Sequence, residues 1–587
     1  MTISEMLTER VQAALAGHSQ PVPEGFVAEV VPAADARYGD YQSNAAMTLA
    51  KVWKQNPRAL AQEIAQRVDV SGLCAPPEVA GAGFVNFKVL PEALEGRLAQ
   101  LLGDEKLGVP QAAVPRTIVV DFSAPNVAKQ MHVGHIRSTI IGDALARIAR
   151  FTGHRVVTDN HIGDWGTQFG MVLYGWKHFL DSAALGADPI TELLRLYKQV
   201  NALQEADPEV REICKGELVK LQAGDVENRE IWRECVRVSL DGLNVIYGKL
   251  GVQFDHHLGE SFYNDRLAPL VEELLHSGVA VESEGAVVVL SDGSVPPAED
   301  PFMGMDRETK EWKAVPMLIR KSDGGFLYAT TDLATLEYRV QEWGADEIWY
   351  VVGMPQGLHF RQLFAAAGRL GLPQTLVHVA FGSILGEDGK MFKTRSGESV
   401  GLKEVLEEGI RRARILVEEK NAGLSEEEKQ EVAEVVGLGA VKYAELSQNR
   451  LTDYKFSWDK MLSLQGNTAP YLQYSYVRTR SIFRKLGGEP VNLSGPFVIG
   501  DDAERALALK LAQFGEVVPA VLRDWRPSLL AAYLYEAATR FHSFYEACPV
   551  LKAEGAARDT RIALCEAASR VLREGLNLLG IRVTERM

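Results

Sequence analysis

The chain has 587 residues, more than one hydrophobic core holds, and its length predicts about three to four domains. The five cysteines are scattered, without the C-x-x-C spacing of a zinc site or the density of a disulfide frame, which predicts a reducing compartment, the cytoplasm. With no signal-like start and no long apolar run, we expect no membrane segment. The net charge of −15 means that any nucleic-acid partner would need local basic tracks.

Residues 1–110 are predicted to form a small α+β domain. An amphipathic helix opens it, with Met6, Val11 and Leu15 on one face. Residues 81–89 then alternate like a strand after a glycine turn. Gly108-Val109-Pro110 marks a linker, which places the domain boundary there.

Residues 115–400 alternate apolar strands with helices. The strands are expected at residues 117–122, 155–159, 347–352 and 376–384. This alternation predicts a parallel, doubly wound sheet of the Rossmann-like, nucleotide-binding type. Two insertions interrupt it, a charge-rich helical one at about residues 189–250 and a small β-rich one at about residues 286–328.

From residue 401 to 587 the pattern is helical, with no convincing strand. Long amphipathic segments cover residues 529–544 and 562–579. This part is predicted to be an all-α bundle. The whole chain is therefore expected to be an α/β multidomain protein with an appended domain at each end.

Two short motifs carry the chemistry. His132-Val133-Gly134-His135 lies between a predicted strand and a predicted helix, where bare backbone N–H groups and ring nitrogens favour a phosphate. Lys390-Met391-Phe392-Lys393-Thr394 lies in a glycine-rich loop, where two lysines can place positive charge over the same phosphates. In this order the two motifs resemble the HIGH and KMSKS signatures of class I aminoacyl-tRNA synthetases.

The surrounding residues indicate which aminoacyl-tRNA synthetase family the chain resembles. Residues 123–131 (SAPNVAKQM), 163–170 (GDWGTQFG), 328–332 (YATTD) and 467–471 (NTAPY) closely resemble bacterial-type arginyl-tRNA synthetases, and the resemblance runs from about residue 26 to the end. It implies a monomeric ligase that makes arginyl-adenylate from L-arginine and ATP with Mg²⁺, without a structural metal. The arginyl group then passes to the terminal ribose of tRNA(Arg), and activation itself is expected to require bound tRNA.

The resemblance also implies roles for individual residues. The catalytic set is His132, His135, Lys390 and Lys393, supported by Lys129, and Gly134, Met391 and Phe392 complete the ATP site. Asp332 lies one helical turn after Tyr328, so the two can face one guanidinium, with Asp121 as the second acid. The ends of the amino acid are assigned to Ser123, Asn126 and Gln356. Trp165 and Gln168 are expected to shape the pocket.

For tRNA, the resemblance assigns Phe84 and Asn86 to the elbow, and Tyr471 and Arg478 to the anticodon-binding bundle. Stacking plus an edge hydrogen bond suits a single-stranded base. Phe84 is equally well explained as a core aromatic. The basic run after the tyrosines (Arg478, Arg480, Arg484, Lys485) also fits a solvated helix face.

Other readings remain open from these residues. A glutamyl enzyme should offer arginines where this chain has Asp121 and Asp332, and a cysteinyl enzyme needs zinc ligands. A retired synthetase-like RNA-binding protein has no reason to keep His132, His135 and Lys393 together. A small-substrate adenylate-forming ligase, such as a pantothenate synthetase, would not need the domains predicted at both ends.

Overall fold

A computed structural model describes residues 1–33, 35–372, 374–386, 388–390, 400–420 and 423–587. The chain forms two compact units. The first contains Met1–Ala112, Leu416–Tyr443 and Leu462–Met587, and the second contains Ala113–Ile415 and Ala444–Met461. The amino-terminal region and most of the carboxyl-terminal helices therefore belong to one unit.

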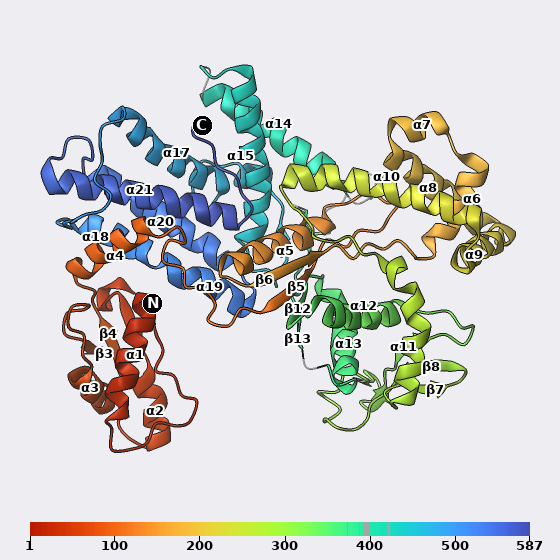
Figure 1. The fold of residues 1–587 in the computed structure, drawn as a ribbon, viewed down its shortest axis with the longest axis horizontal. Coiled ribbons are helices and arrows are strands. Elements are labelled where there is room, and N and C mark those ends of the chain that lie inside the picture. Colours follow the sequence, from red (N-terminus) through yellow and green to blue (C-terminus); the bar gives the residue numbers. More distant parts are fainter. Residues whose placement is uncertain (34, 373, 387, 391–399, 421–422) are drawn as a thin grey trace. The chain divides into compact units, whose positions relative to one another are not determined.

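A four-stranded parallel sheet forms the centre of the second unit (Figure 1). Its strands are β5 (Thr117–Asp121), β6 (Arg155–Asp159), β12 (Glu347–Tyr350) and β13 (Thr375–His378), in the order β13-β12-β5-β6. Their apolar runs suit strands that are covered on both faces. The strand order reverses between β5 and β12, and this is the point at which open α/β sheets bind ligands.

The helices of this sheet carry most of the predicted site. They are α5 (Gly134–Phe151), α12 (Tyr328–Trp343) and α13 (Gly357–Arg369), with the short η3 (Met354–Gln356). Helix α5 joins β5 to β6, and α13 joins β12 to β13. This arrangement confirms the predicted Rossmann-like fold class.

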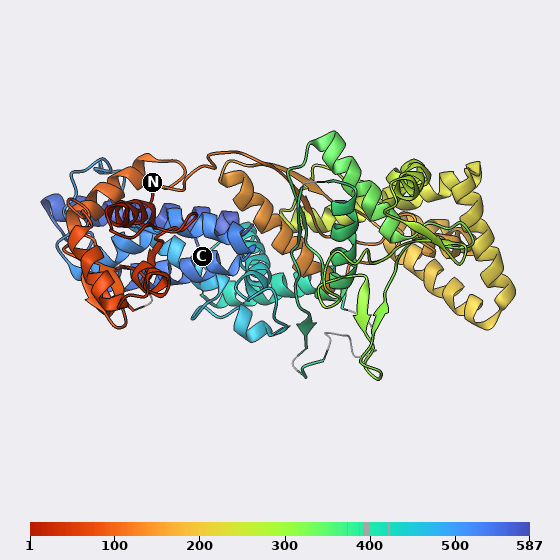
Figure 2. The ribbon, with the colours of Figure 1, turned by 90° about the horizontal axis from the view of Figure 1, so that it is seen from below.

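Five helices follow β6, coloured golden to yellow in Figure 2: α6 (Gln168–Phe179), α7 (Ser182–Ala187), α8 (Pro189–Ala206), α9 (Pro208–Ala223) and α10 (Val226–Leu250). Asp188, Asp207 and Asp225 cap the last three through side-chain hydrogen bonds to backbone N–H groups. Such caps, with proline at the first helical position of α8 and α9, explain why these helices begin where they do.

After η2 (Glu260–Tyr263) and α11 (Asn264–His276), the chain becomes β-rich. The strands β7 (Val281–Ser283), β8 (Ala286–Val289) and β11 (Met317–Arg320) form one antiparallel sheet, and β9 (Met303–Met305) pairs with β10 (Trp312–Ala314).

The structure corrects two strand predictions. The strand expected at residues 376–384 ends at His378, and Ile384–Leu385 form a separate strand, β14. Its parallel partner is β15 (Tyr454–Lys455), in a region predicted to have no strand. Two residues are too few to show an alternating pattern, so this pairing left no signal in the sequence. Helix α14 (Leu402–Lys420) follows β14 in the sequence, and helix α16 (Trp458–Met461) follows β15.

In the first unit, four short strands form an antiparallel sheet in the order β1-β2-β4-β3: β1 (Val30–Pro32), β2 (Tyr41–Ser43), β3 (Glu78–Ala80) and β4 (Phe84–Phe87). The amino-terminal helices are η1 (Ala36–Tyr38), α1 (Ile3–Ala16), α2 (Ala45–Trp53), α3 (Pro57–Arg67) and α4 (Pro91–Gly103). The later helices are α15 (Glu426–Leu446), α17 (Ala469–Leu486), α18 (Asp502–Ala512), α19 (Phe514–Asp524), α20 (Ser528–Ala547) and α21 (Gly555–Leu578). Within the described ranges, no helix is long and apolar enough to cross a membrane.

A largely buried carboxyl group joins the two ends of the chain in this unit. Glu516 on α19 accepts hydrogen bonds at Oε1 from the backbone N–H of Ser4, at 3.0 Å, and from the Tyr41 hydroxyl, at 2.9 Å. Burial raises the pKa of Glu516 from 4.5 to about 7. Because the folded state favours the protonated acid, this contribution to stability is complete below about pH 4.5 and is lost as pH rises through 7.

We predict that Glu516→Gln stabilises the protein at pH 8, because the neutral amide keeps the shape without the buried charge. The free energy of unfolding should rise by on the order of 2 kcal/mol at pH 8 and stay unchanged near pH 4.5. Urea titrations followed by circular dichroism at both pH values measure this. Glu536→Gln, on a side chain that is 61% exposed, is the control and should show no such difference. Equal stability of Glu516→Gln and the parent at pH 8 would contradict the assignment.

Candidate active site

The two histidines of the first motif pack together where α5 begins. Their ring centroids lie 4.0 Å apart. The His132 N–H donates to Nδ1 of His135 at 3.2 Å, and the Gly134 N–H donates to Nδ1 of His132 at 3.1 Å. A Cβ at position 134 would lie 2.8 Å from the His132 ring, so glycine is needed for this fold of the turn. The backbone thus engages each Nδ1, which leaves each Nε2 for a ligand.

Both imidazoles are neutral near pH 7. Burial lowers the pKa of His135 from 6.5 to about 4, and the neighbouring His132 lowers it further. Burial also lowers the pKa of His132. Neutral rings can donate or accept hydrogen bonds but bring no positive charge. The charge opposing a nucleotide phosphate must therefore come from elsewhere in the site.

The loop between β5 and this turn is strained. Ser123, Ala124 and Ala128 have φ angles of 75°, 46° and 60°, in the left-handed region that residues other than glycine rarely adopt. Backbone strain of this kind concentrates at binding and catalytic sites. Two of the resembling segments meet here, because Gly163 exchanges backbone hydrogen bonds with Pro125 and Val127 at 3.1 and 3.0 Å. A Cβ at position 163 would collide with the exposed Asn126 side chain.

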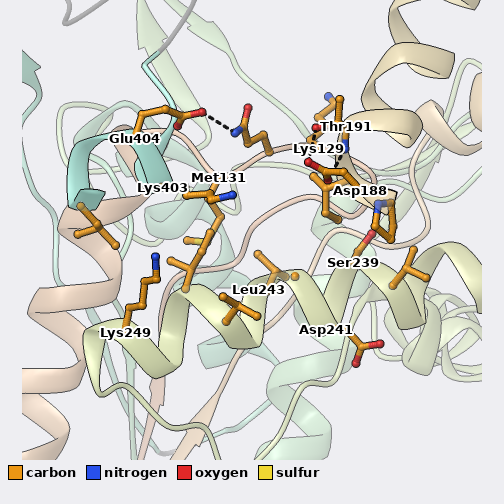
Figure 3. Close-up of a pocket in the computed structure, with 18 of the residues that line it drawn as sticks. Lys129, Met131, Asp188, Thr191, Ser239, Asp241, Leu243, Lys249, Lys403 and Glu404 are labelled. Atoms are coloured by element: carbon orange, nitrogen blue, oxygen red, sulfur yellow. Dashed lines mark hydrogen bonds between the residues drawn. The ribbon is translucent and has the colours of Figure 1, made fainter. Parts of the chain in front are cut away.

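The far side of this loop faces a cavity of about 590 Å³ (Figure 3). Asn126 and Lys129 line it together with residues of α8, α10 and α14. The Lys129 ammonium lies 4.9 Å from the centroid of the Tyr197 ring on α8. Gln130 donates from Nε2 to Oε1 of Glu404 at 3.1 Å, as the dashed line in Figure 3 marks. Lys129 therefore lies against the helical insertion.

The predicted guanidinium site lies at the start of α12. Tyr328 is the first residue of this helix and is 60% exposed. Asp332 follows one turn later, with Oδ2 2.7 Å from Nε2 of His359. The Tyr328 ring lies 4.8 Å from the same histidine. The structure thus brings Tyr328 and Asp332 together and adds His359, which no sequence motif marked.

A second acid, Glu260 on η2, interacts electrostatically with Asp332. Burial raises the pKa of Glu260, and the nearby charges of Asp164 and Asp332 raise it further. Two carboxylates that repel each other in this way favour a cation between them. Glu260 was missed from the sequence because it belongs to none of the resembling segments.

Asp121, expected to be the second acid, has an internal partner. Nη2 of Arg339 on α12 donates to Oδ2 of Asp121 at 2.7 Å and to Oδ2 of Asp159 at 2.8 Å. All three side chains are buried. Oδ2 of Asp121 thus has an internal guanidinium partner, and its role as the second acid for the substrate's guanidinium stays a prediction.

The Ser123 side chain, expected to bind one end of the amino acid, is also hydrogen-bonded within the protein. Ser123 Oγ lies 2.8 Å from the Tyr247 hydroxyl and accepts a hydrogen bond from Oγ1 of Thr139 at 2.9 Å. Asn126 and Gln356, assigned to the same ends, are exposed. They therefore remain the open polar groups of this set.

The lysine loop is tied to the histidine turn at its far end. Val133 N–H donates to the carbonyl of Val400 at 2.9 Å, and Leu402 N–H donates to that of Met131 at 2.9 Å. Lys390 is exposed at the start of the loop, where Gly386 N–H donates to its carbonyl at 2.7 Å. Met391, Phe392, Lys393 and Thr394 lie outside the described residues.

In the first unit, the residues expected to bind tRNA fall in two places. On β4, Phe84 is half-buried and Asn86 is buried, and the structure gives the Asn86 Oδ1 no hydrogen-bond partner within its described ranges. Tyr471 and Arg478 on α17 meet His542 on α20, with ring centroids 5.3 Å apart for Tyr471 and an Nη1–Nδ1 distance of 2.8 Å for Arg478.

The predicted basic run is divided between two environments. Arg480 lies within 3.4 Å of Glu566 and 3.3 Å of Glu585, and Arg484 donates to the Glu585 carbonyl at 2.7 Å. Arg478 instead lies over the Tyr474 and Tyr545 rings, 5.7 and 5.0 Å from their centroids. Arg480 also lies 5.0 Å from the centroid of the Phe483 ring, so both arginines contact aromatic rings.

Comparisons with known proteins agree with this geometry. Three family models match the chain: "Arginyl tRNA synthetase N terminal domain" at residues 5–89, "tRNA synthetases class I (R), catalytic domain" at residues 97–458, and "DALR anticodon binding domain" at residues 472–587. The arginine–tRNA ligases of Cellvibrio japonicus and Chromobacterium violaceum are 45% and 44% identical, each over 100% of both chains. The arginyl-tRNA synthetase structure from Thermus thermophilus is 26% identical, with a TM-score of 0.82 over 100% of both chains.

A parallel sheet with a histidine-pair turn at its switch point, tied to a lysine loop, defines a class I aminoacyl-tRNA synthetase. The chain belongs to the arginyl-tRNA synthetase family. The predicted family, fold class and enzyme class are thus confirmed, and the glutamyl, cysteinyl and small-substrate alternatives are set aside.

We predict that His135 stays neutral throughout the working pH range, because protonation would place a charge in a buried position beside His132. Its ring should titrate near pH 4 in ¹⁵N NMR spectra of histidine-labelled protein, with His135→Gln providing the assignment. The folded pKa lies below the ordinary 6.5, so this contribution to stability is complete above pH 6.5 and is lost as pH falls through 4. A midpoint at or above 6.5 would contradict the burial argument.

Proposed function

We propose that the chain binds L-arginine and ATP in the crevice between β5 and β12, forms arginyl-adenylate, and transfers the arginyl group to the terminal ribose of tRNA(Arg). One observation carries this proposal. The histidine turn is hydrogen-bonded to the end of the lysine loop, and the same unit presents the acids Asp332 and Glu260 for a cation. Phosphate-binding groups and a guanidinium site therefore belong to one sheet edge.

Adenylate formation needs alignment and charge neutralisation. A carboxylate oxygen of arginine attacks the α-phosphorus, the bond to the bridging oxygen breaks, and pyrophosphate leaves with the electron pair. His132 and His135 would hydrogen-bond the phosphates and the ribose region, and Gly134 leaves room for the adenine. Lys390 and Lys393, with Lys129, would supply the positive charge, and Met391 and Phe392 complete the loop. Each correctly aimed donor lowers the activation free energy by roughly 3 to 4 kcal/mol.

The arginine side chain would lie between two acids. Asp332 and Glu260 would accept from the guanidinium, and Tyr328 would close the site at the helix start. Asn126 and Gln356 would hold the amino and carboxylate ends. The two acids repel each other while no cation lies between them, so substrate binding relieves an unfavourable charge arrangement. A glutamate side chain would increase that repulsion.

Mg²⁺ would arrive with ATP. In the ranges that the structure describes, no group of three histidine, cysteine or acidic side chains is placed to hold a metal ion. Phosphate oxygens and water molecules are the usual partners of this ion in ATP-dependent enzymes. No step proposed above depends on a protein ligand to it.

The appended parts would hold the tRNA. Residues 1–110 would contact its elbow through Phe84 and Asn86. Residues 401–587 would bind the anticodon stem and loop, with Tyr471 and Arg478 as stacking groups. Residues 115–400 form the catalytic part in this proposal. A monomer in the cytoplasm remains our prediction.

Pyrophosphate exchange tests the proposed function. Exchange should depend on arginine among the amino acids and should be negligible until tRNA(Arg) is added, because we expect tRNA to favour the competent state of the site. The tRNA midpoint should weaken steeply with salt, since phosphate contacts dominate such binding. Robust exchange in RNase-treated enzyme would refute the tRNA requirement alone. Exchange with a different amino acid would refute the assigned substrate.

The acid pair gives a separate prediction. Glu260→Gln and Asp332→Asn should each weaken arginine binding by roughly 3 to 5 kcal/mol, because each leaves a buried guanidinium with one acid fewer. Asp265→Asn, in the first turn of the neighbouring helix α11, is the matched control and should leave binding unchanged. Isothermal calorimetry with arginine measures all three. Unchanged affinity in Glu260→Gln would remove Glu260 from the pocket.

A further inference from the structure

A buried ion pair anchors the helix that carries the histidine turn. Arg137 lies on α5, two residues beyond His135, and its side chain is 1% exposed. Its Nε donates to Oε2 of Glu445 at 2.9 Å, and its Nη1 donates to the carbonyl of Thr452 at 3.1 Å. The rings of Phe381 and Tyr454 lie 5.8 and 5.4 Å from the guanidinium. Arg137 is thus held by groups from residues 444–456, here called the clamp segment.

A second residue of the clamp segment, Tyr454, binds the same carboxylate. Glu445 has a fully buried side chain, and its second oxygen accepts a hydrogen bond from the Tyr454 hydroxyl. Removing one partner of such a pair leaves the other charge buried and unpaired, which is strongly unfavourable. A pair of this kind does more to define geometry than to stabilise the fold.

The clamp segment also holds the strand that leads into the lysine loop. β14 pairs with β15 through Ile384 opposite Tyr454 and Leu385 opposite Lys455. Gly382 N–H donates to the carbonyl of Arg450 at 2.8 Å, and a Cβ at position 382 would lie 2.8 Å from the Thr452 carbonyl oxygen. Leu385 immediately precedes Gly386, the first glycine of the loop. One segment therefore touches both the helix that carries the histidine turn and the strand that leads into the lysine loop.

We propose that Arg137 and Glu445 are positioning residues for adenylate formation, which set the start of the lysine loop relative to the histidine turn. The inference deepens the proposed function and rests on the roles given there to His135 and Lys393. The far end of the loop is already tied to the turn through Val133 and Val400. The near end follows β14, which is not a strand of the main sheet, and the clamp segment supplies its anchor.

The size of the effect follows from geometry. Arg137 and Glu445 act through other groups, so their loss displaces the phosphate-binding groups and leaves the arginine pocket on α12 and η2 in place. Misplacing reacting groups by about 1 Å can lower a rate about a hundredfold. The signature of positioning is thus a loss of turnover without a matching loss of arginine affinity.

Glu445→Gln tests this, with Asp143→Asn as the matched control. Asp143 pairs with Arg147 on the same helix α5 at 2.8 Å, with side chains 9% and 29% exposed, and neither residue touches the clamp segment in the contacts described. In exchange assays with arginine, ATP and tRNA(Arg), Glu445→Gln should lower turnover about a hundredfold and leave the arginine KM within about twofold. Asp143→Asn should leave both within about twofold.

Tyr454→Phe removes the hydrogen bond to Glu445 within the clamp segment and keeps the ion pair, so turnover should fall about tenfold. If Glu445→Gln does not fold, as judged by thermal unfolding and arginine calorimetry, Tyr454→Phe decides, and full turnover in it overturns the proposal. A folded Glu445→Gln within about threefold of the parent also overturns it. So does a parallel loss of turnover and arginine affinity, which indicates a structural role only.

His135→Ala, measured beside these variants, separates this inference from the proposed function. It should lower turnover about a hundredfold or more. Near-normal turnover in His135→Ala would refute the catalytic role that the clamp is inferred to serve. A deficient His135→Ala beside an active Glu445→Gln would refute the clamp alone.

Discussion

The pairing of guanidinium groups with buried carboxylates is the interaction on which this site depends. Arg339 holds Asp121 and Asp159 at the ends of β5 and β6, and Arg137 holds Glu445 next to the histidine turn. In the proposed function, the substrate would make the same kind of contact with Asp332 and Glu260. A planar guanidinium with several fixed donors orients carboxylates more strictly than an ammonium does. The internal ion pairs and the proposed substrate pocket thus both rest on guanidinium–carboxylate contacts.

This arrangement explains how an arginine pocket can exist beside internal arginines. Arg339 is fully buried, and its Nη2 donates to one oxygen of Asp121 and one oxygen of Asp159. The acids proposed for the substrate lie on other elements, Asp332 on α12 and Glu260 on η2, and Asp332 also contacts His359 at 2.7 Å. Burial and the charges of Asp164 and Asp332 raise the pKa of Glu260, and a cationic substrate would offset the repulsion between the acids.

The phosphate-binding side is prepared in a different way. The imidazoles of His132 and His135 are neutral, three residues of the preceding loop are held in left-handed conformations, and the lysines come from a separate loop. Hydrogen-bonding groups are thus fixed in advance, and in the proposed function the positive charge would come from the lysine loop. Preorganised donors cost no rearrangement when charge develops in the transition state.

The sequence alone determined a large part of this. Apolar runs predicted the parallel sheet, because strands covered on both faces need apolar residues throughout. The aspartates at 188, 207 and 225 are local caps, and the helices of the insertion begin directly after them. The histidine and lysine motifs indicated the family, since several short segments at large spacings rarely coincide.

The tertiary structure alone decided the partners of the acids. Asp121 met Arg339, the charge of Asp332 came to act on Glu260 of η2, and Glu445 met Arg137 across 308 residues of chain. Residues that meet over such separations share no helical or strand period, and the two-residue strands β14 and β15 are too short to have one. Burial in a specific fold sets the charge and the partners of such groups, and no local pattern of the sequence encodes it.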